Sequence, residues 1–425
     1  MAMRISIVGG GYVGLVSATC LADLGHSVIL IDIDEDKVEA INCGMSPIYE
    51  KGLNELLSAH IGRDLQAATG YEDLVSSDLT LICVGTPPLS DGSADLSMIE
   101  SASALIGRAL EGKEKYHVVA VKSTVPPGTT QNLVMPAVLK HSGKSASKIG
   151  FVMNPEFLRE GLAVQDFMKP DRIVIGSSDE QAGDTVESAY RGIDAPIVRT
   201  GLIVAEMIKY TSNAFLATKI SFSNEIGNVC KKLGIDVYEV MRGVGLDHRI
   251  NPYFLNAGLG FGGSCFPKDV SALIHLAERM EVTPVLLRSV MDVNEQQPMK
   301  IVEILLKKVE DIKGKRVAVL GLAFKNDTDD VRESRAVPVI KELVGRGALV
   351  AAYDPKANAF MREILPEIEY CNSASDALIG ADAVLVLTEW PEFGDLDKEF
   401  ELMRSRVIID GRRILSCRDA EGICW

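Results

Sequence analysis

Short apolar runs alternate with helical stretches over the first half of the chain. The opening "MRISIVGGGYVGLVSATCLADLGHSVILIDID" predicts a strand, a turn over Gly9 to Gly14, a helix and a second strand. Further strand-like runs follow in "LTLICVGTP", "HVVAVKSTV", "GFVMNPEF" and "DRIVIGSS", with helical stretches between them. Strands that alternate with helices are typical of a doubly wound parallel sheet.

The pattern changes after Leu202, where apolar positions recur with helical spacing. The run "IVAEMIKYTSNAFLATKISFSNEIGNVCKKLG" predicts one long helix, and "DVSALIHLAERM" and "LLRSVMDVNEQQPMKIVEILLKKV" are helical as well. We therefore expect an all-helical middle segment with the long helix as its spine.

The C-terminal segment repeats the order of the N-terminal one. "RVAVLGLAF" parallels "RISIVGGGY", "ALVAAYDP" parallels "SVILIDID", and "DAVLVLTEW" parallels "DLTLICVGT". The sequence thus predicts an α/β protein in which two Rossmann-like doubly wound parallel-sheet domains are joined by a central all-helical domain. The predicted domains are residues 1–200, 201–300 and 301–425.

Length and charge narrow the class of protein. A chain of 425 residues is too long for one ordinary core. Its apolar runs are too short and interrupted to span a membrane, and a net charge of −15 argues against a nucleic-acid partner. The N-terminus runs straight into a strand and lacks the features of a signal peptide, so we expect a cytoplasmic protein.

The 8 cysteines are scattered singly, without C-x-x-C or zinc-like Cys/His spacing. We expect no metal site. Most of these thiols should be small buried hydrophobic groups, as the patterns around Cys20, Cys83 and Cys230 indicate.

The first glycine turn has the form G-x-G-x-x-G, with Gly9, Gly11 and Gly14 between a strand and a helix. Asp32 ends the next strand. This context predicts a dinucleotide site, with the pyrophosphate at the helix N-terminus and Asp32 on the ribose hydroxyls. A carboxylate there repels a 2′-phosphate, which favours NAD over NADP. Lys37 lies either near the ribose or on a solvated helix face.

The corresponding turn of the C-terminal segment, "GLAFKNDTDD", lacks the second and third glycines. It is not expected to hold a dinucleotide in the same way. A mononucleotide, as part of a substrate, fits this architecture better.

One cysteine stands in unusual surroundings, in "GFGGSCFPKD". A lone cysteine is most often a structural thiol. Here Gly262 and Gly263 leave the backbone open to a ligand, and Lys268 and Asp269 follow Cys265 at once, which is typical of reactive thiols. With NAD present, a nucleophilic cysteine indicates oxidation of an aldehyde through a thioester.

At these residues the sequence resembles the nucleotide-sugar 6-dehydrogenases over nearly its whole length. The resemblance is carried, in the family's order, by "GGGYVGLVSA", "VGTPPLSDGSADLS", "VKSTVPPGTT", "NPEFLREGLAVQDF", "EMIKYTSNAF", "LDHRINPYFLNAGLGFGGSCFPKD", "GLAFKNDTDDVRES" and "DGRR". It implies two successive oxidations at C6 of a nucleotide sugar, from alcohol to carboxylate, with two NAD+ consumed. UDP-glucose is the substrate that it favours.

The resemblance also assigns roles to residues. Cys265 matches the nucleophile, and Lys209 matches a lysine that stabilises oxyanions. Asn213, four residues on, matches a substrate-orienting asparagine on the same helix face. Asp269 matches an acid that, with water, helps to take the alcohol proton. Thr124 and Glu156 match residues that position or activate water, with Glu156 as a base for thioester hydrolysis.

Arg249 matches an arginine that reaches a neighbouring subunit's site, which implies a homodimer or higher homo-oligomer, although a surface ion pair would also explain it. For the cofactor, the implied residues are Gly9, Gly11, Tyr12, Val13, Gly14, Asp32, Lys37, Thr86, Thr124, Glu160, Lys268 and Arg332. For the substrate, they are Glu156, Phe157, Leu158, Glu160, Lys209, Asn213, Arg249, Tyr253, Phe254, Gly262, Cys265, Phe324, Lys325 and Arg412, with Arg413 beside it.

Several alternatives stay open. Within the family, GDP-mannose is the nearest rival substrate. Phe266 after the cysteine, "PDRIVIG" and "LDHRI" favour UDP-glucose, whereas the asparagine of "DHRIN", in place of the commoner R-I-G, and the terminal "EGICW" do not. Ser264 argues against the N-acetylhexosamine enzymes. A one-step β-hydroxyacid dehydrogenase would not need Cys265, and a non-catalytic nucleotide-sugar sensor would have no use for the thiol.

Overall fold

The computed structural model describes residues 2–417 and 419–425 and divides into two compact units, residues 1–212 and residues 213–425. The boundary falls within the long helix α8 (Leu202–Leu233). The three-part division expected from the sequence stays a prediction.

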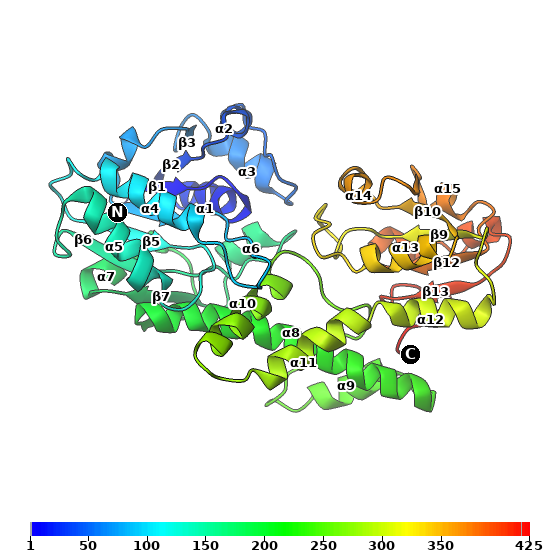
Figure 1. Ribbon diagram of the computed structural model, residues 1–425. Coiled ribbons are helices and arrows are strands. Elements are labelled where there is room, and N and C mark those ends of the chain that lie inside the picture. The colour runs from blue at the N-terminus through cyan, green and yellow to red at the C-terminus, as the bar shows by residue number, and fades with distance from the viewer. Residues whose placement is uncertain (1, 418) are drawn as a thin grey trace. The chain divides into compact units, whose positions relative to one another are not determined.

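The N-terminal unit is built on an eight-stranded sheet (Figure 1). In spatial order its strands are β3 (Leu65–Ala68), β2 (Ser27–Ile31), β1 (Arg4–Val8), β4 (Leu79–Ile82), β5 (His117–Val121), β6 (Ile149–Met153), β7 (Ile173–Ser177) and β8 (Ile197–Thr200). The first six follow the 3-2-1-4-5-6 order of dinucleotide-binding folds. The predicted parallel sheet is confirmed with one departure, because β6 and β7 pair antiparallel.

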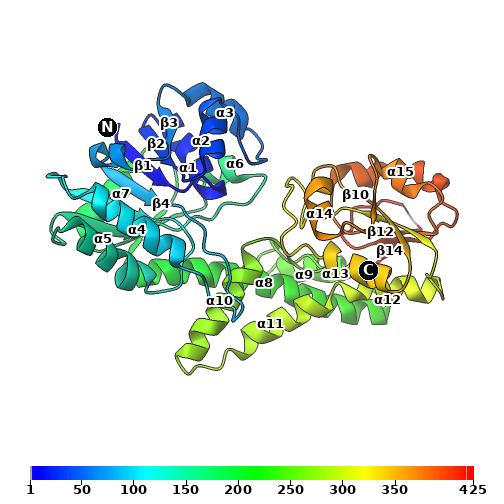
Figure 2. The ribbon, with the colours of Figure 1, turned by 45° about the horizontal axis from the view of Figure 1, so that its top comes forward.

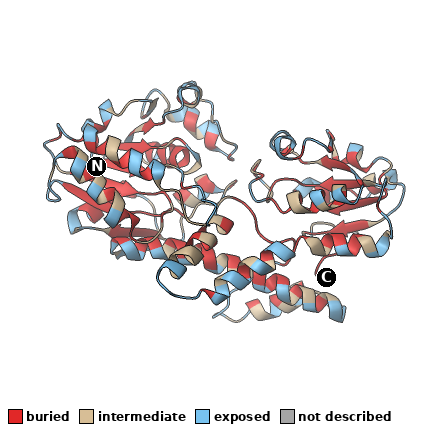
Figure 3. Ribbon diagram, in the orientation of Figure 1, coloured by how far each residue is buried: buried red, intermediate tan, exposed pale blue. Residues whose placement is uncertain are grey.

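Helices cover both faces of this sheet (Figures 1 and 3). They are α1 (Tyr12–Asp23), α2 (Glu35–Asn42), α3 (Leu53–His60), η1 (Glu72–Ser76), α4 (Ser97–Ala109), η2 (Thr130–Val134), α5 (Met135–Ser142), α6 (Ala163–Met168) and α7 (Glu180–Ala189). All five residues of β5 are buried. Val118 packs into one apolar cluster and Val119 into another, because successive strand residues face opposite sides of the sheet.

The C-terminal unit repeats this strand order in a smaller, wholly parallel sheet (Figure 2). Its strands are β11 (Glu369–Tyr370), β10 (Leu349–Tyr353), β9 (Arg316–Leu320), β12 (Ala383–Val386), β13 (Ile408–Asp410) and β14 (Glu421–Gly422). Its helices are α13 (Ala336–Gly345), α14 (Asn358–Ile364), α15 (Ala374–Leu378), η3 (Pro391–Asp395) and η4 (Glu399–Leu402). The predicted internal repeat of two Rossmann-like sheets is confirmed.

Along the sequence, the elements between β8 and β9 are all helices. After α8 come α9 (Val237–Gly245), α10 (Phe266–Arg279), α11 (Val285–Gln296) and α12 (Met299–Lys308). Ala217 of α8, Val270 of α10 and Val290 of α11 belong to one apolar cluster, so these three helices pack together. Within the described part of the chain, no helix is both long and apolar enough to cross a membrane.

Candidate active site

The glycine turn between β1 and α1 has the close packing of a dinucleotide-binding turn. Gly9 has a φ of +106°, and a Cβ on it would lie 2.8 Å from the Cys83 backbone. A Cβ on Gly14 would lie 1.8 Å from the Gly9 carbonyl oxygen, so only glycine lets α1 pack this closely. A Cβ on Gly11 would meet no atom within 4 Å. The space at the α1 N-terminus is therefore open to a phosphate.

The Asp32 carboxylate is held at the same turn. Its Oδ2 accepts the Gly10 N–H at 2.5 Å and its Oδ1 accepts the Asp34 N–H at 3.0 Å. Lys37 Nζ lies 3.7 Å from Oδ2, so the structure places this lysine beside the carboxylate. A fixed carboxylate next to a glycine turn suits the ribose hydroxyls of NAD and opposes a 2′-phosphate.

The exchange Gly11→Ala is expected to leave the fold intact and to weaken NAD binding by about tenfold or more, a loss of about 1.4 kcal/mol. The added methyl group would enter the open space in which the phosphates have to approach the backbone. Calorimetric titration with NAD measures the affinity. Gly14→Ala is the control, since its Cβ would overlap Gly9 and should lower the melting temperature. Unchanged NAD affinity in Gly11→Ala would contradict this placement.

Glu50 is a buried carboxylate that the sequence did not single out. It accepts the N–H groups of Gly161 and Ala163 at 2.7 and 2.9 Å, and it binds the Tyr12 hydroxyl. Glu50 thus ties the start of α1, where Tyr12 was predicted to contact the cofactor, to the N-terminus of α6. In the sequence, Glu50 is a single acidic residue in a loop, and this pattern is the same as that of a glutamate exposed to solvent.

Glu156 and Lys209, both predicted to be catalytic, form a buried ion pair. Lys209 Nζ lies 3.0 Å from Glu156 Oε1, and their side chains are 4% and 7% exposed. Glu156 Oε2 accepts the Leu158 N–H at 2.5 Å. Lys209 is therefore not an ordinary exposed helix lysine, since a buried lysine is rare unless it is paired.

The Phe157 ring, predicted at the substrate site, contacts two cations. The Arg172 guanidinium carbon lies 3.9 Å from the ring centroid and Lys209 Nζ lies 5.3 Å from it. Arg172 also donates a hydrogen bond to the Ser212 hydroxyl at 3.1 Å. In the sequence, Arg172 had no role of its own: it stood in a predicted strand and in the run "PDRIVIG" that favours UDP-glucose.

Thr124 follows β5 and Thr86 follows the neighbouring strand β4. The Thr86 hydroxyl donates a hydrogen bond to the Thr124 carbonyl oxygen at 2.9 Å. The segment after Thr124 is bound to α8 by Glu206. This fully buried carboxylate accepts the Thr130 N–H at 2.8 Å and the Thr130 hydroxyl at 2.7 Å, and burial raises its pKa. The sequence did not single out Glu206. The remaining predicted residues of this unit are partly exposed: Val13, Leu158 and Glu160.

In the C-terminal unit, the exposed Cys265 thiol stands at the N-terminus of α10. The Asp269 carboxylate, one turn on, is buried. It accepts a hydrogen bond from Asn213 Nδ2 at 2.6 Å and lies 2.6 Å from Lys268 Nζ. The structure therefore brings these four predicted residues into one region. The positive end of a helix dipole favours negative charge, which suits a thiolate at Cys265.

The glycines before Cys265 allow another segment of the chain to pack closely on them. A Cβ on Gly263, which has a φ of +80°, would lie 2.8 Å from the Phe324 ring. One on Gly262 would lie 2.3 Å from the Glu333 carbonyl oxygen. Both glycines are buried. The segment after β9 packs directly on the side of each glycine where a Cβ would stand, and the approach of a ligand to their backbone stays a prediction.

Arg412 connects the loop after β12 to the cysteine loop. Its Nε donates to the Leu387 carbonyl oxygen at 3.0 Å, and its Nη1 donates to that of Gly260 at 3.2 Å. Lys325 is half-buried in the segment after β9. Arg332 is exposed there and lies 2.6 Å from the Asp330 carboxylate.

Three further predicted residues lie in the loop between α9 and α10. The Arg249 side chain is 78% exposed and pairs with Asp247 at 2.6 Å, so in this chain it makes the surface ion pair that the sequence left open. Tyr253 is 73% exposed. Phe254 packs edge-on against Phe266, with ring centroids 6.4 Å apart.

Asn251, which replaces the commoner glycine after "DHRI", has a φ of +69°. Asparagine tolerates this left-handed conformation, and its Oδ1 accepts the Tyr253 N–H at 3.0 Å. Asn251→Gly should therefore be nearly neutral, whereas Asn251→Val should lower the unfolding free energy by about 1–2 kcal/mol. Urea denaturation measures both variants, and equal stabilities would contradict this explanation.

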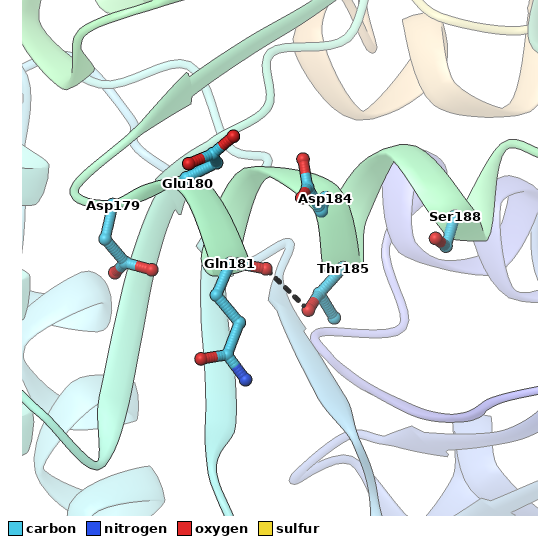
Figure 4. Close-up of a pocket in the computed structure, with 6 residues that line it drawn as sticks. All are labelled: Asp179, Glu180, Gln181, Asp184, Thr185 and Ser188. Carbon is cyan, nitrogen blue, oxygen red and sulfur yellow. Dashed lines mark hydrogen bonds between the residues drawn. The ribbon is translucent and has the colours of Figure 1, made fainter.

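A surface hollow lies along α7 (Figure 4). It is lined by Asp179, Glu180, Gln181, Asp184, Thr185 and Ser188. The Thr185 hydroxyl bonds the Gln181 carbonyl oxygen, Asp179 caps the helix, and Asp184 pairs with Arg199. None of the residues predicted for cofactor or substrate lines this hollow.

Sequence models of one family match the chain in three consecutive stretches. They are described as the UDP-glucose/GDP-mannose dehydrogenase family NAD binding domain, over residues 3–194, its central domain, over 203–296, and its UDP binding domain, over 318–417.

Three individual proteins illustrate the similarity. A UDP-glucose 6-dehydrogenase of Haloferax volcanii is 48% identical over 98% of both chains. A UDP-glucose dehydrogenase structure from Pyrobaculum islandicum is 44% identical, with a TM-score of 0.95 over 100% of this chain and 98% of its own. A GDP-mannose 6-dehydrogenase of Azotobacter vinelandii is 39% identical over the full length of both chains. Together with the glycine turn, Asp32 and the repeated sheets, these matches show that the chain belongs to the UDP-glucose/GDP-mannose dehydrogenase family, as an NAD-dependent nucleotide-sugar 6-dehydrogenase.

Proposed function

We propose that the protein oxidises UDP-glucose at C6 to UDP-glucuronate, with Cys265 as the nucleophile. The observation that carries the proposal is the exposed thiol at the N-terminus of α10, one turn from the buried Asp269. Oxidation that stopped at an aldehyde would not need a thiol in this position. NAD+, bound at the glycine turn, supplies the oxidising equivalents, two molecules for each sugar.

The thiolate acts once the C6 alcohol has become an aldehyde. Cys265 Sγ forms a bond to C6, and the carbonyl oxygen takes a proton to give a thiohemiacetal. Oxidation of this adduct at C6 leaves a thioester. Water then adds to the thioester, the S–C6 bond breaks, and the carboxylate leaves while Sγ is restored as thiolate.

The other predicted residues hold or move protons and charge. Asp269, fixed by Asn213 and Lys268, accepts the alcohol proton through water. The Lys209 ammonium stabilises negative charge on the reacting oxygen. Glu156 serves as the base that activates water for hydrolysis, and Thr124 orients this water.

The substrate assignment rests on the relatives and on Phe266. The C-terminal sheet repeats the mononucleotide-binding strand order, and the family's UDP binding domain covers it. The test compares kcat/KM for UDP-glucose and GDP-mannose under the same conditions. UDP-glucose is expected to be preferred by at least about 10²-fold, since a site built to hydrogen-bond one base and sugar rejects the wrong partner strongly. A preference for GDP-mannose would agree with the proposed reaction but contradict the assignment of UDP-glucose as the substrate.

We also propose that the protein is a homodimer in which Arg249 serves the partner's site. Three apolar side chains spaced seven residues apart on α8 are 53–63% exposed, namely Phe215, Phe222 and Val229. Such a row is typical of a helix that packs against another subunit.

Phe222→Asp is expected to convert a dimer into a monomer of 45.9 kDa, because the carboxylate would be buried in the contact. Light scattering measures the mass. Phe360→Asp, at a 48% exposed site on α14, is the matched control and should stay dimeric. A monomeric wild-type protein would refute the proposal.

A further inference from the structure

The loop that leads to Cys265 is buried but has no regular secondary structure. Residues 257–263 are all buried, and no strand or helix begins between α9 and Phe266. Buried main-chain N–H and C=O groups need hydrogen-bond partners. Here most of these partners come from side chains on other elements, whereas the Gly263 N–H donates to the Arg332 carbonyl oxygen at 2.9 Å.

Three buried amide side chains supply most of them, and we call these the amide clamp: Asn224 of α8, Asn294 of α11, and Gln297 just after α11. Gly258 donates its N–H to Asn224 at 2.7 Å and accepts from Gln297 at 2.9 Å. Asn294 alone satisfies both main-chain groups of Phe261, accepting its N–H at 2.7 Å and donating to its carbonyl oxygen at 3.0 Å.

The loop also fits closely around Asn294. Gly260 has a φ of +94°, and a Cβ on it would lie 2.5 Å from Asn294 Oδ1. Its carbonyl oxygen is bound by Arg412. A shift of the backbone from Gly258 to Phe261 would therefore leave several buried polar groups unpaired.

Cys265 follows four residues after Phe261, where the loop becomes α10. The amides bond the main chain at Gly258 and Phe261, and we assign them no chemical step. We infer that Asn294, supported by Asn224 and Gln297, is a positioning residue that fixes the approach of the Cys265 loop and so holds the thiol at the α10 N-terminus. This inference rests on the proposed function, in which Cys265 is the nucleophile.

The test combines turnover with a measurement that needs no substrate. In Asn294→Ala, kcat with UDP-glucose is expected to fall by about 10²-fold while KM changes little, because misplacing a reacting group by about 1 Å costs that much. Alkylation by iodoacetamide, followed by peptide mass spectrometry, gives the rate at Cys265 relative to the exposed Cys43 of the same molecule. This ratio is expected to fall severalfold as the thiol leaves the helix N-terminus.

Asn358→Ala is the matched control. Asn358 also binds one main-chain N–H, of Asp354, and one main-chain carbonyl oxygen, of Cys371, each at 2.9 Å. Its loss should cost similar stability but leave kcat and the alkylation ratio unchanged. If Asn294→Ala does not fold, Asn224→Ala, which removes only the Gly258 bond, is measured in the same way.

The inference is overturned if the clamp variants keep the wild-type kcat and alkylation ratio, or if Asn358→Ala changes both equally. Failure of the proposed function gives a different result. In that case Cys265→Ser would still form the acid. The alkylation ratio would still measure the effect of the amide clamp on Cys265, because it needs no substrate.

Discussion

Replacement of Cys265 by serine is expected to lower the rate of acid formation by at least about 10⁴-fold, as for other enzymes that lose a nucleophile. Serine preserves the shape of the α10 N-terminus, but its hydroxyl is not ionised at neutral pH and cannot form the thioester. NADH release with UDP-glucose and mass spectrometry of the product measure the loss.

Binding separates loss of chemistry from loss of structure in this variant. The affinities for NAD and UDP-glucose should stay near those of the wild type, because Asp32, the glycine turn and the nucleotide-contacting residues are untouched. Cys43→Ser, at another exposed cysteine, is the matched control and should keep full activity. Formation of the uronic acid at an unchanged rate by Cys265→Ser would contradict the assignment of Cys265 as the nucleophile.

Lys209→Met is expected to lower kcat by about 10²–10³-fold, the usual cost of losing one group that stabilises an oxyanion. It should also destabilise the protein by about 3–5 kcal/mol, because Glu156 keeps a buried charge without its partner 3.0 Å away. Steady-state kinetics and urea denaturation measure the two effects.

A second substitution separates these effects. Glu156→Gln combined with Lys209→Met removes both buried charges, so stability should recover while activity does not. Lys122→Met is the control, since Lys122 is equally buried but bonds neutral groups of Asn154 and Tyr190. It should lose stability with little change in kcat. Recovery of activity in the double variant would show that Lys209 has only a structural role.

The fold could be predicted from the sequence because the patterns that indicate strands, turns and helices are local. Apolar runs with glycine turns predicted both sheets, and the parallel between "RISIVGGGY" and "RVAVLGLAF" predicted that they share one strand order. The antiparallel pairing of β7 was not foreseen, because a buried strand has the same apolar pattern in either direction.

The site residues were predicted from motifs, but no motif predicted the residues that contact them. Glu50, Arg172 and Glu206 act through contacts with residues 15 to 113 positions away, so no local spacing reveals them. Asn294 did leave a trace in the sequence. It stands four residues after the buried Val290 on a predicted helix, and a polar residue on an apolar face indicates a buried hydrogen bond.

The glycines before Cys265 show how one motif can have two explanations. Glycine allows two things, close approach of a ligand and close approach of another segment of the chain. The sequence alone does not distinguish them. The structure shows the second of these, because Phe324 and Glu333 fill the space in which a Cβ on Gly263 or Gly262 would stand.

The measurement that tests the central claim most directly is the amount of NADH formed per sugar, with a limiting amount of UDP-glucose and excess NAD+. Oxidation through a Cys265 thioester to the carboxylate predicts two NADH for each sugar consumed. One NADH for each sugar would mean that the reaction stops at an aldehyde or ketone, and Cys265 would have no role as nucleophile.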